Sequence, residues 1–456
     1  MLKYNLLQHT WIKTLTTNRW PLLIARAVAL GGFVFAILAG IIGTPVGNHN
    51  FAIVAVWIAW WAALMLVIVP FLGRSWCAVC PIPMPGEWLQ NGAVLGPIQD
   101  KNKRKKFRRF PKIFRNIWLQ NVAFTLLALF SAVILTRPSV TAWVLLGMIL
   151  IAAGLSLVYE RRAFCRHLCP VGGFIGLYSQ LAPVELRVID TQVCKAHTEK
   201  SCYQGSENGF GCPWNIYPGG MISGKSVNTN CGLCMECLRT CDYDNIALNL
   251  RAFGADIQPQ NKIKLDEAYK AFIMLGSALV YSAVMLGPWG SLKNAAYQVG
   301  TLPWFGYAVA LLAFTWVLLP VSFYLITQIA NRLNPTSQSP RQNFEAYASA
   351  LLPLGLAAWV AFSFSFVFAN ISYLWPVLSD PFGWGWNLFQ TAGVAWTPIF
   401  SSQVPALQVL VLIGGLIWSG NTTQKIAIDR NASRQTWPVM AFIFAVTLLL
   451  IWLFVA

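Results

Sequence analysis

Long runs of hydrophobic residues alternate with short polar segments along most of the chain. A helix needs about 20 mostly apolar residues to cross the hydrocarbon core of a bilayer, and about nine runs have suitable length. The predicted spans lie near residues 21–43, 51–72, 117–136, 140–159, 271–287, 304–330, 346–369, 402–420 and 437–456. The first run is too long for a signal peptide and lacks a small-residue cleavage site, so we expect it to stay in the mature protein.

One long segment, from about Pro183 to Lys270, interrupts this pattern. It contains 10 of the 16 acidic residues and seven of the 11 cysteines, and no run long enough to span a membrane. Within it, residues 245–251 alternate apolar and polar side chains, which is typical of a short strand. Residues 2–19 set leucines and Trp11 among basic residues, as in a helix that lies on a membrane surface.

These patterns predict four parts: an interfacial helix at 1–20, a four-helix membrane domain at 21–182, an inserted α+β domain at 183–270 and a five-helix membrane domain at 271–456. The composition agrees with a polytopic all-α membrane protein. Only 11% of the residues are charged, whereas soluble domains are nearer a quarter.

The net charge of +17 lies mostly in loops that share one side of the membrane if the spans alternate. By the positive-inside rule that side is the cytoplasm. We therefore expect a protein of the cell's inner membrane whose N-terminus and inserted domain lie on the cytoplasmic side and whose C-terminus lies outside. The densest basic run, from Lys101 to Arg115, adjoins a predicted span. We therefore interpret it as a topology signal on anionic headgroups and expect no nucleic-acid partner.

The strongest chemical motif is the C-x2-C-x2-C-x3-C run formed by Cys231, Cys234, Cys237 and Cys241. In bacterial two-cluster ferredoxins, three thiolates at this spacing bind one four-iron cluster and the fourth binds its neighbour. Cys212 precedes a proline, as the last cysteine of the ferredoxin motif does, so we expect it to complete the first cluster with Cys231, Cys234 and Cys237. Four buried free cysteines or a zinc site are the alternatives, although zinc usually takes two separated C-x2-C pairs.

Cys241 is then expected to join Cys194 and Cys202 in a second [4Fe-4S] cluster, which lacks a fourth thiolate. His197 stands at the C-x2-C spacing from Cys194, and imidazole is an acceptable iron ligand. A three-iron cluster, a water-ligated iron or a thiolate from elsewhere in the chain are the alternatives. An odd number of cysteines at ligand spacings argues against a disulfide framework.

Two further cysteine pairs follow the second and fourth predicted spans. Cys77 and Cys80 form one pair, and Cys165 and Cys169 form the other; each pair follows an aromatic residue and precedes a proline. We interpret this as a duplicated hairpin that carries one pair per repeat. Brought together, the four thiolates would form an additional iron-sulfur or metal site at the membrane surface. A redox dithiol or a transient metal site is the alternative.

Several cofactors are not expected. None of the four histidines lies in the middle of a span, and the sequence has neither a C-x-x-C-H motif nor a strand followed by G-x-G-x-x-G, so we predict no haem, flavin or nucleotide. The phosphate-loop pattern from Gly219 to Ser226 lacks the strand and helix that would make it bind phosphate. Apart from Arg26, the predicted spans contain no ionisable residue.

Three motifs together resemble the membrane-bound polyferredoxins over about residues 20–270: the pairs at 77/80 and 165/169, each followed by proline, and the run at 231–241. This family includes the quinol-dehydrogenase subunit of periplasmic nitrate reduction, the nitrous-oxide-reductase regulator and the cytochrome oxidase accessory protein. The resemblance implies an electron-transfer subunit, rather than a self-contained enzyme, that connects a quinone pool or cytoplasmic reductant with a partner redox subunit through four-iron clusters. An accessory protein that reduces a metal ion or thiols for a larger enzyme is the alternative.

The chain departs from this family in three ways. Cys77 and Cys80 are separated by two residues rather than the usual three, and the first ferredoxin motif is degenerate. The last five spans have no counterpart in the shortest members. We interpret these spans as a docking platform for other subunits or as a wall of a quinone site.

Overall fold

The computed structural model describes residues 3–94, 107–221, 229–257, 263–287 and 289–455. The chain folds into two compact units. The first comprises residues 1–35, 67–120 and 143–256, and the second comprises residues 36–66, 121–142 and 257–456. All eleven cysteines belong to the first unit. The basic residues from Lys101 to Lys106 and the phosphate-loop pattern beyond Met221 lie outside the described residues.

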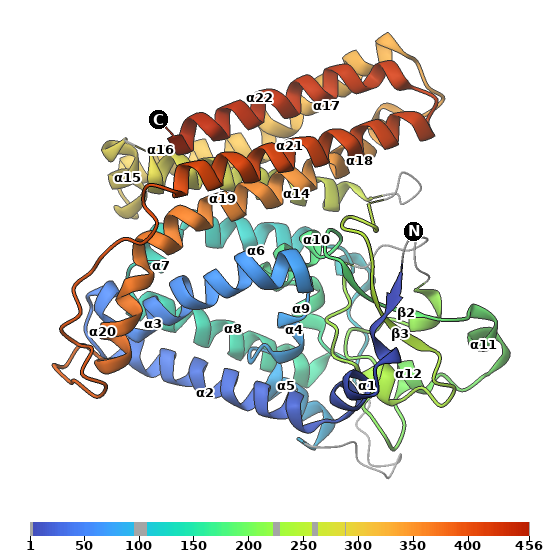
Figure 1. The fold of residues 1–456 in the computed structure, drawn as a ribbon, viewed down its shortest axis with the longest axis horizontal. Coiled ribbons are helices and arrows are strands. Elements are labelled where there is room, and N and C mark those ends of the chain that lie inside the picture. Colours follow the sequence, from blue (N-terminus) through green and yellow to red (C-terminus); the bar gives the residue numbers. More distant parts are fainter. Residues whose placement is uncertain (1–2, 95–106, 222–228, 258–262, 288, 456) are drawn as a thin grey trace. The chain divides into compact units, whose positions relative to one another are not determined.

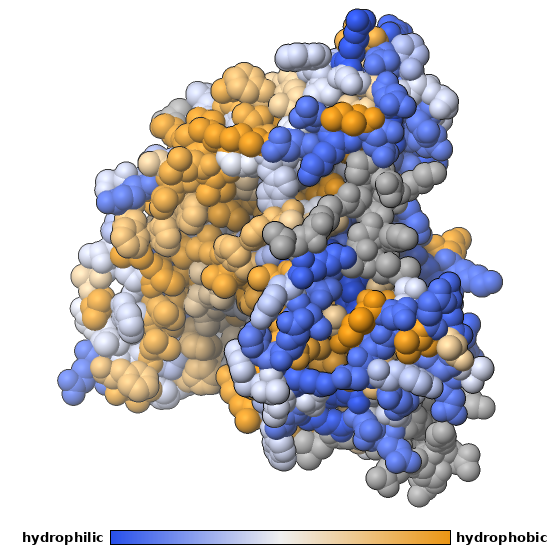
Figure 2. All heavy atoms as spheres, turned by 45° about the vertical axis from the view of Figure 1, so that its right-hand side comes forward, coloured by the Kyte–Doolittle hydropathy of each residue, from blue (hydrophilic) through white to orange (hydrophobic). Residues whose placement is uncertain are grey.

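Eight helices in the described ranges are long and apolar enough to cross a membrane. They are Trp20–Ile42 (α2), Phe51–Leu72, Pro138–Val158 (α8), Leu265–Leu286, Leu302–Leu333, Pro340–Ser379, Val404–Asp429 (α21) and Ser433–Val455. Figure 2 shows hydrophobic side chains gathered over a broad part of the visible surface. The chain is therefore a mostly helical, polytopic membrane protein.

The span predicted at 117–136 differs from the others. The structure has two short helices there, α6 (Trp118–Leu129) and α7 (Ser131–Ile134), and each is shorter than a bilayer requires. The helices are separated at Phe130, whose ψ of 7° lies outside the helical range. α6 also carries buried polar side chains, those of Gln120, Asn121 and Thr125.

The second unit is a helical bundle. Besides α7 and α21 it contains α3 (Phe51–Ile53) and η3 (Val54–Trp60), which lead into η4 (Ala63–Leu72), whose residues from 67 on belong to the first unit. Its other helices are α14 (Leu265–Tyr281), α15 (Gly290–Tyr297), α16 (Leu302–Ala313), α17 (Leu319–Leu333), α18 (Pro340–Ala348), α19 (Leu352–Asn370), α20 (Leu374–Ser379) and α22 (Thr436–Val455). In Figure 1, α19, α21 and α22 run alongside one another. A Cβ on Gly415 of α21 would lie 2.5 Å from the Cβ of Ala357 of α19, so these two helices approach closely, as small residues allow in membranes.

α14 begins at Leu265, six residues before the predicted span. It therefore includes Asp266 and Lys270, which are both buried. The Lys270 ammonium lies 5.6 Å from the centroid of the Phe124 ring. The expectation that Arg26 is the single ionisable residue of the spans is wrong for this helix, because the helix extends past the start of the apolar run.

The first unit contains a three-stranded antiparallel sheet. Its order is β1 (Tyr4–Asn5), β3 (Ile246–Leu250) and β2 (Val184–Val188), with Leu186 opposite Leu248. β3 confirms the strand predicted at 245–251. The remaining helices of this unit are short: α1 (Thr10–Thr17), α4 (Trp76–Val79), α5 (Met84–Asn91), α9 (Ala163–His167), α10 (Pro170–Tyr178), α11 (Thr191–Ala196), α12 (Ser201–Gln204) and α13 (Glu236–Arg239).

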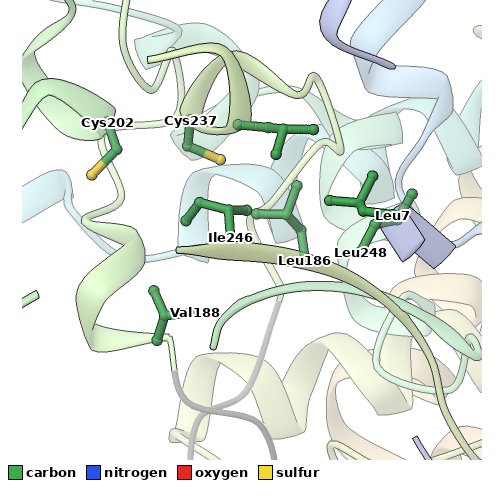
Figure 3. Packing of buried hydrophobic residues seen from close by; sticks show 8 residues of the cluster. Leu7, Leu186, Val188, Cys202, Cys237, Ile246 and Leu248 are labelled. Atoms are coloured by element: carbon green, nitrogen blue, oxygen red, sulfur yellow. The ribbon is translucent and has the colours of Figure 1, made fainter. Parts of the chain in front are cut away.

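One face of the sheet packs against cysteines. Leu186, Ile246 and Leu248 form a buried cluster with Cys202 and Cys237 (Figure 3). These apolar side chains hold the cysteine-bearing segments against the strands. Burying apolar surface in this way is the main favourable contribution to the stability of such a small unit.

The N-terminal segment completes this unit. Its helix α1 is shorter than the helix predicted at 2–19, because Tyr4 and Asn5 pair with β3 and Leu7 joins the hydrophobic cluster. The Nζ atom of Lys13 lies 2.5 Å from Asp244 Oδ2. The N-terminal segment therefore packs on the sheet and the hydrophobic cluster of the first unit. Its position at a membrane surface stays a prediction.

The opposite face of the sheet buries four charged side chains, those of Glu185, Arg187, Arg251 and Asp256. Asp256 Oδ1 lies 2.9 Å from Arg187 Nη2 and 2.5 Å from Arg251 Nη1, and Glu185 Oε2 lies 2.6 Å from Arg251 Nη1. Two positive and two negative groups compensate one another, as buried charges require. The polar positions of β2 are consequently as buried as its apolar ones.

Candidate functional site

Cys77, Cys80, Cys165 and Cys169, here called the paired-cysteine site, occupy short helices and their ends. Cys77 lies in α4, which ends at Cys80, and Cys165 lies in α9. Cys169 is the N-cap of α10, where its Sγ accepts a hydrogen bond from Gly172 N at 3.2 Å. The local helices thus present all four thiols from two corresponding segments.

The thiols of this site are buried and influence one another. Cys77, Cys165 and Cys169 are at most 7% exposed. Burial raises the pKa of Cys169 to about 11, and it also raises the pKa values of Cys80 and Cys165. Negative charge on Cys77 and Cys169 raises the pKa of Cys80 further. The structure therefore brings the two predicted pairs within electrostatic reach of each other.

Two arginines connect the repeats. Arg74 stands three residues before Cys77, and Arg162 stands three residues before Cys165. Arg74 Nη2 donates a hydrogen bond to the carbonyl oxygen of Cys165 at 3.2 Å, and Arg162 Nη1 donates one to the carbonyl oxygen of Cys77. Each repeat supplies the arginine that holds the first cysteine of the other.

Both guanidinium groups lie over the ring of Trp214. The Cζ atoms of Arg74 and Arg162 lie 4.4 Å and 5.3 Å from its ring centroid, which is suitable for cation–π attraction. A Cβ on Gly232 would lie 2.5 Å from Trp214 Nε1, so this position has room for glycine alone. Because Trp214 follows the Cys212-Pro213 pair, it packs the ferredoxin-like motifs against the arginines of the paired-cysteine site.

Glu87 of α5 compensates the charge of Arg162, whose side chain is 1% exposed. Arg162 Nε donates to Glu87 Oε1, and Nη2 lies 3.0 Å from Oε2. Burial alone would raise the pKa of Glu87, but Arg162 and Arg26 outweigh it and hold that pKa below its ordinary value of 4.5. Burial would lower the pKa of Arg162, but Glu87 and, next, Cys165 and Cys234 raise it. Arg162 is thus within electrostatic reach of two groups of thiols.

Cys212, Cys231, Cys234 and Cys237, the first ferredoxin set, also gather. Burial raises the pKa of Cys234 to about 12, with Cys212 among the charges that add to it. The pKa of Cys237 is raised by burial and then by Cys231, Cys234 and Cys212. The loop turns through Leu233 and Met235, whose positive φ values of 50° and 61° are uncommon outside glycine and cluster at functional sites.

Cys194, Cys202 and Cys241 form the second ferredoxin set, and Asn245 contacts two of them. Burial raises the pKa of Cys202 to about 12, and Cys241 and Cys194 add to it. Asn245 Nδ2 donates to Cys194 Sγ at 3.2 Å, and its backbone N donates to Cys241 Sγ at 3.4 Å. Cys202 also influences the pKa of Cys237 of the first ferredoxin set, so the two sets lie within electrostatic reach of each other, and the membership and ligation of each cluster stay predictions.

His197 has one ring nitrogen in use. Nδ1 lies 2.7 Å from the carbonyl oxygen of Val193, which can only accept, so Nδ1 carries the proton. The ring stacks on Tyr243 at a centroid distance of 4.5 Å. In metal-binding histidines a backbone carbonyl commonly fixes one nitrogen in this way and leaves the lone pair of the other for the metal. Ligation by His197 stays a prediction.

The donor set fits iron-sulfur clusters in its chemistry. Within the described ranges, no three Cys, His, Asp or Glu side chains are arranged to hold a single metal ion. A four-iron cluster takes one thiolate per iron, and its negative charge is stabilised by nearby cations and N–H donors. The arginines beside Trp214, the amide of Gly172 and the amides of Asn245 supply such groups.

Sequence reasoning missed the residues around the thiols. A signal existed for Arg74 and Arg162, because both repeats place an arginine three residues before the first cysteine. Trp214 had a weaker signal in its position after a Cys-Pro pair. Glu87 and Asn245 had none, because their partners lie 75 and 51 residues away in the chain.

Comparison with known proteins supports this chemistry. A family model described as a 4Fe-4S binding domain matches residues 53–105 and 141–187. Each matched segment includes one cysteine pair, at 77/80 and at 165/169, in agreement with the predicted duplication. No curated protein and no solved structure matches the chain. The chain is thus similar in two segments to 4Fe-4S binding domains of ferredoxin type, and iron-sulfur electron transport in a membrane protein is the function that this similarity supports.

Proposed function

We propose that this protein is a membrane-bound polyferredoxin that carries electrons between a donor or acceptor at the membrane and a partner redox subunit. The main support is that all eleven cysteines lie in one compact unit. Within that unit, Arg162 and Trp214 pack between the paired-cysteine site and the first ferredoxin set. A bound 4Fe-4S cluster supplies one-electron chemistry.

The chain's own residues hold and adjust these sites. The paired-cysteine site is the place for one cluster, the first ferredoxin set for a second, and the second ferredoxin set with His197 for a third. Arg74 and Arg162 place positive charge beside the thiols, which favours the more negative, reduced state. Asn245 donates N–H groups to two sulfurs of the second ferredoxin set with the same effect.

Iron and sulfide analysis with reduced-state EPR tests this proposal on anaerobically purified protein. We expect at least two four-iron clusters. The double variant Cys77→Ser/Cys165→Ser should lose the iron of one cluster and keep the EPR signals of the ferredoxin sets. Cys234→Ser should lose the EPR signal of the first ferredoxin set and keep the iron of the paired-cysteine site. About four irons in total, with one EPR-visible cluster, would contradict the ligation by Cys212 and Cys241.

The same spectra test the role of His197. His197→Cys replaces an imidazole with a thiolate and should lower the reduction potential of one cluster, because imidazole ligation generally raises it. An unchanged potential and spectrum would show that His197 is not a ligand.

The accessory role requires thiols that react readily. Cys77, Cys165 and Cys169 are buried, which favours a permanent cluster over a transient metal or thiol site. Alkylation of the anaerobically purified protein followed by peptide mapping separates the two functions. Protection of Cys77 and Cys165 is expected, and full modification of both would contradict the cluster assignment.

We infer that the N-terminus and the predicted ferredoxin-like domain at 183–270 face the cytoplasm and that the C-terminus lies outside, with α6 and α7 together making one crossing in addition to the eight long helices. The support is the basic character of connecting segments such as Arg108–Arg115, which precedes α6. Redox partners would dock at the first unit, and the helices of the second unit would contact other membrane subunits or quinone. A C-terminal alkaline phosphatase fusion should be active, and an inactive fusion that is stably produced would contradict this orientation.

A further inference from the structure

A pocket of about 250 Å³ lies in the first unit, and its lining includes Arg166 and Pro213, which follow Cys165 and Cys212 in the chain. Its lining comes from the segment before α6, the start of α9 and the stretch around Trp214. The charged lining side chains are those of Arg109, Arg115, Arg161, Arg162, Arg166 and Glu160. Because small-molecule pockets usually measure about 300–1,000 Å³, this one suits a small group rather than a whole cofactor.

The positive charge of this pocket is only partly compensated. Arg162 is paired with Glu87, and Arg109 Nε lies 4.0 Å from Glu160 Oε1. The other three arginines donate to backbone carbonyls: Arg115 to Phe110, Arg161 to Cys212, and Arg166 to Trp214 and Asn215. None of the acidic residues that the structure describes forms an ion pair with these three.

Carbonyl groups orient a guanidinium but do not neutralise it. Three like charges around one small pocket therefore attract an anion, and a ligand with more than one negative oxygen satisfies several of them at once. The planar fork of arginine matches phosphate and carboxylate oxygens in bidentate fashion. Every basic side chain among the described lining residues is an arginine, so the recognition groups that the structure describes are all planar guanidinium groups.

The aromatic side chains of the lining argue against a ring-shaped ligand. Phe110 is stacked on His167 with a centroid distance of 4.7 Å and an interplanar angle of 1°. Arg161 lies 4.4 Å from the centroid of Tyr203, and Arg74 and Arg162 lie over the ring of Trp214. These contacts already use ring faces that a quinone or a nucleotide base would need.

The position of the pocket along the chain favours phosphate. Glu160 follows the end of the span α8 at Val158 by two residues, and Arg115 precedes α6 by three. Basic pockets next to the ends of membrane helices commonly bind phospholipid headgroups. The geometry points to a phosphate-binding site formed by Arg109, Arg115, Arg161 and Arg166, filled either by an anionic phospholipid headgroup or by a soluble phosphate.

The test compares two double variants of the full-length, cluster-containing protein in detergent. Arg109→Gln/Arg115→Gln removes two exposed charges from the lining, and Arg108→Gln/Lys112→Gln removes two charges from the same segment outside it. Retained phosphatidylglycerol and cardiolipin are measured by native mass spectrometry, and binding of inorganic phosphate and pyrophosphate by calorimetry. An unchanged far-UV circular dichroism spectrum shows that both variants are folded.

We expect the lining variant to weaken phosphate binding about tenfold or more, because a hydrogen bond to a charged group contributes about 1.5–3 kcal/mol. The outer variant should stay within about twofold of the unchanged protein. Loss of retained lipid alone identifies a headgroup site, and loss of inorganic phosphate or pyrophosphate binding identifies a soluble ligand. Equal losses in both variants, or no binding in either arm, would overturn the proposal. None of these outcomes depends on the iron content, so they do not affect the proposed electron-transfer function.

Discussion

The ion pair between Glu87 and Arg162 should contribute strongly to stability, and a double-mutant cycle can measure it. Removing one partner of a buried ion pair typically costs about 3–5 kcal/mol, because a buried charge is left without compensation. For Glu87→Gln we expect a loss in this range, since Arg162 is 1% exposed and Glu87 is the carboxylate that forms an ion pair with it. Arg162→Gln should cost less, because Glu87 keeps Arg26 at 3.8 Å.

The double variant should be more stable than the sum of the single losses predicts, with a coupling of about 2–3 kcal/mol. The free energy of unfolding is measured by reversible denaturation in mixed detergent micelles, followed by tryptophan fluorescence. Lys13 and Asp244 provide a matched control, because their side chains are 44% and 65% exposed. Exposed pairs couple by about 0.2–1 kcal/mol. A coupling between Glu87 and Arg162 in that lower range would refute the view that they form a buried, mutually dependent pair.

Three further predictions concern single residues. Because the folded pKa of Glu87 is depressed, its contribution to stability is present above about pH 4.5 and is lost as the pH falls through the lower folded pKa. Acid denaturation curves of Glu87→Gln should lack this loss of stability. Identical curves for the variant and the unchanged protein would contradict this prediction. Gly232→Ala places a Cβ 2.5 Å from Trp214 Nε1, so it should destabilise the protein by about 1–3 kcal/mol in chemical denaturation, whereas Gly220→Ala, which meets nothing within 4 Å, should not. Asn245→Ala removes a side-chain N–H···S bond and should lower the potential of one cluster in an EPR redox titration; an unchanged potential would show that this bond does not tune it.

Local sequence patterns predicted the parts of the fold that depend on spacing or on long apolar runs. The alternation at 245–251 predicted β3, and eight predicted spans correspond to helices in the described ranges, whose ends differ from the predicted ones by up to ten residues. The break at Phe130 was not visible, because the residues on both sides of it are apolar and nothing in the sequence marks the change of backbone angle. An unbroken run therefore predicted one helix where the structure has two short ones.

Buried polar groups escaped prediction for a different reason. The sequence of β2 alternates as β3 does, but it was not predicted as a strand, and its charged positions face Arg251 and Asp256 rather than water. Arg162 likewise finds its carboxylate 75 residues earlier in the chain. Such charges are compensated by residues distant in sequence, and a local pattern contains no information about that pairing.

The exchange of arginines between the two repeats has a consequence for biosynthesis. Arg74 reaches the carbonyl of Cys165, and Arg162 reaches the carbonyl of Cys77. The first hairpin therefore leaves the ribosome without the partner that fixes its cysteine, and the second is synthesised nearly ninety residues later. Both arginines also need Trp214, which follows later still. We therefore expect a nascent chain arrested before Trp214 to expose the thiols of the first pair, because neither the contact from Arg162 nor the ring of Trp214 is yet present.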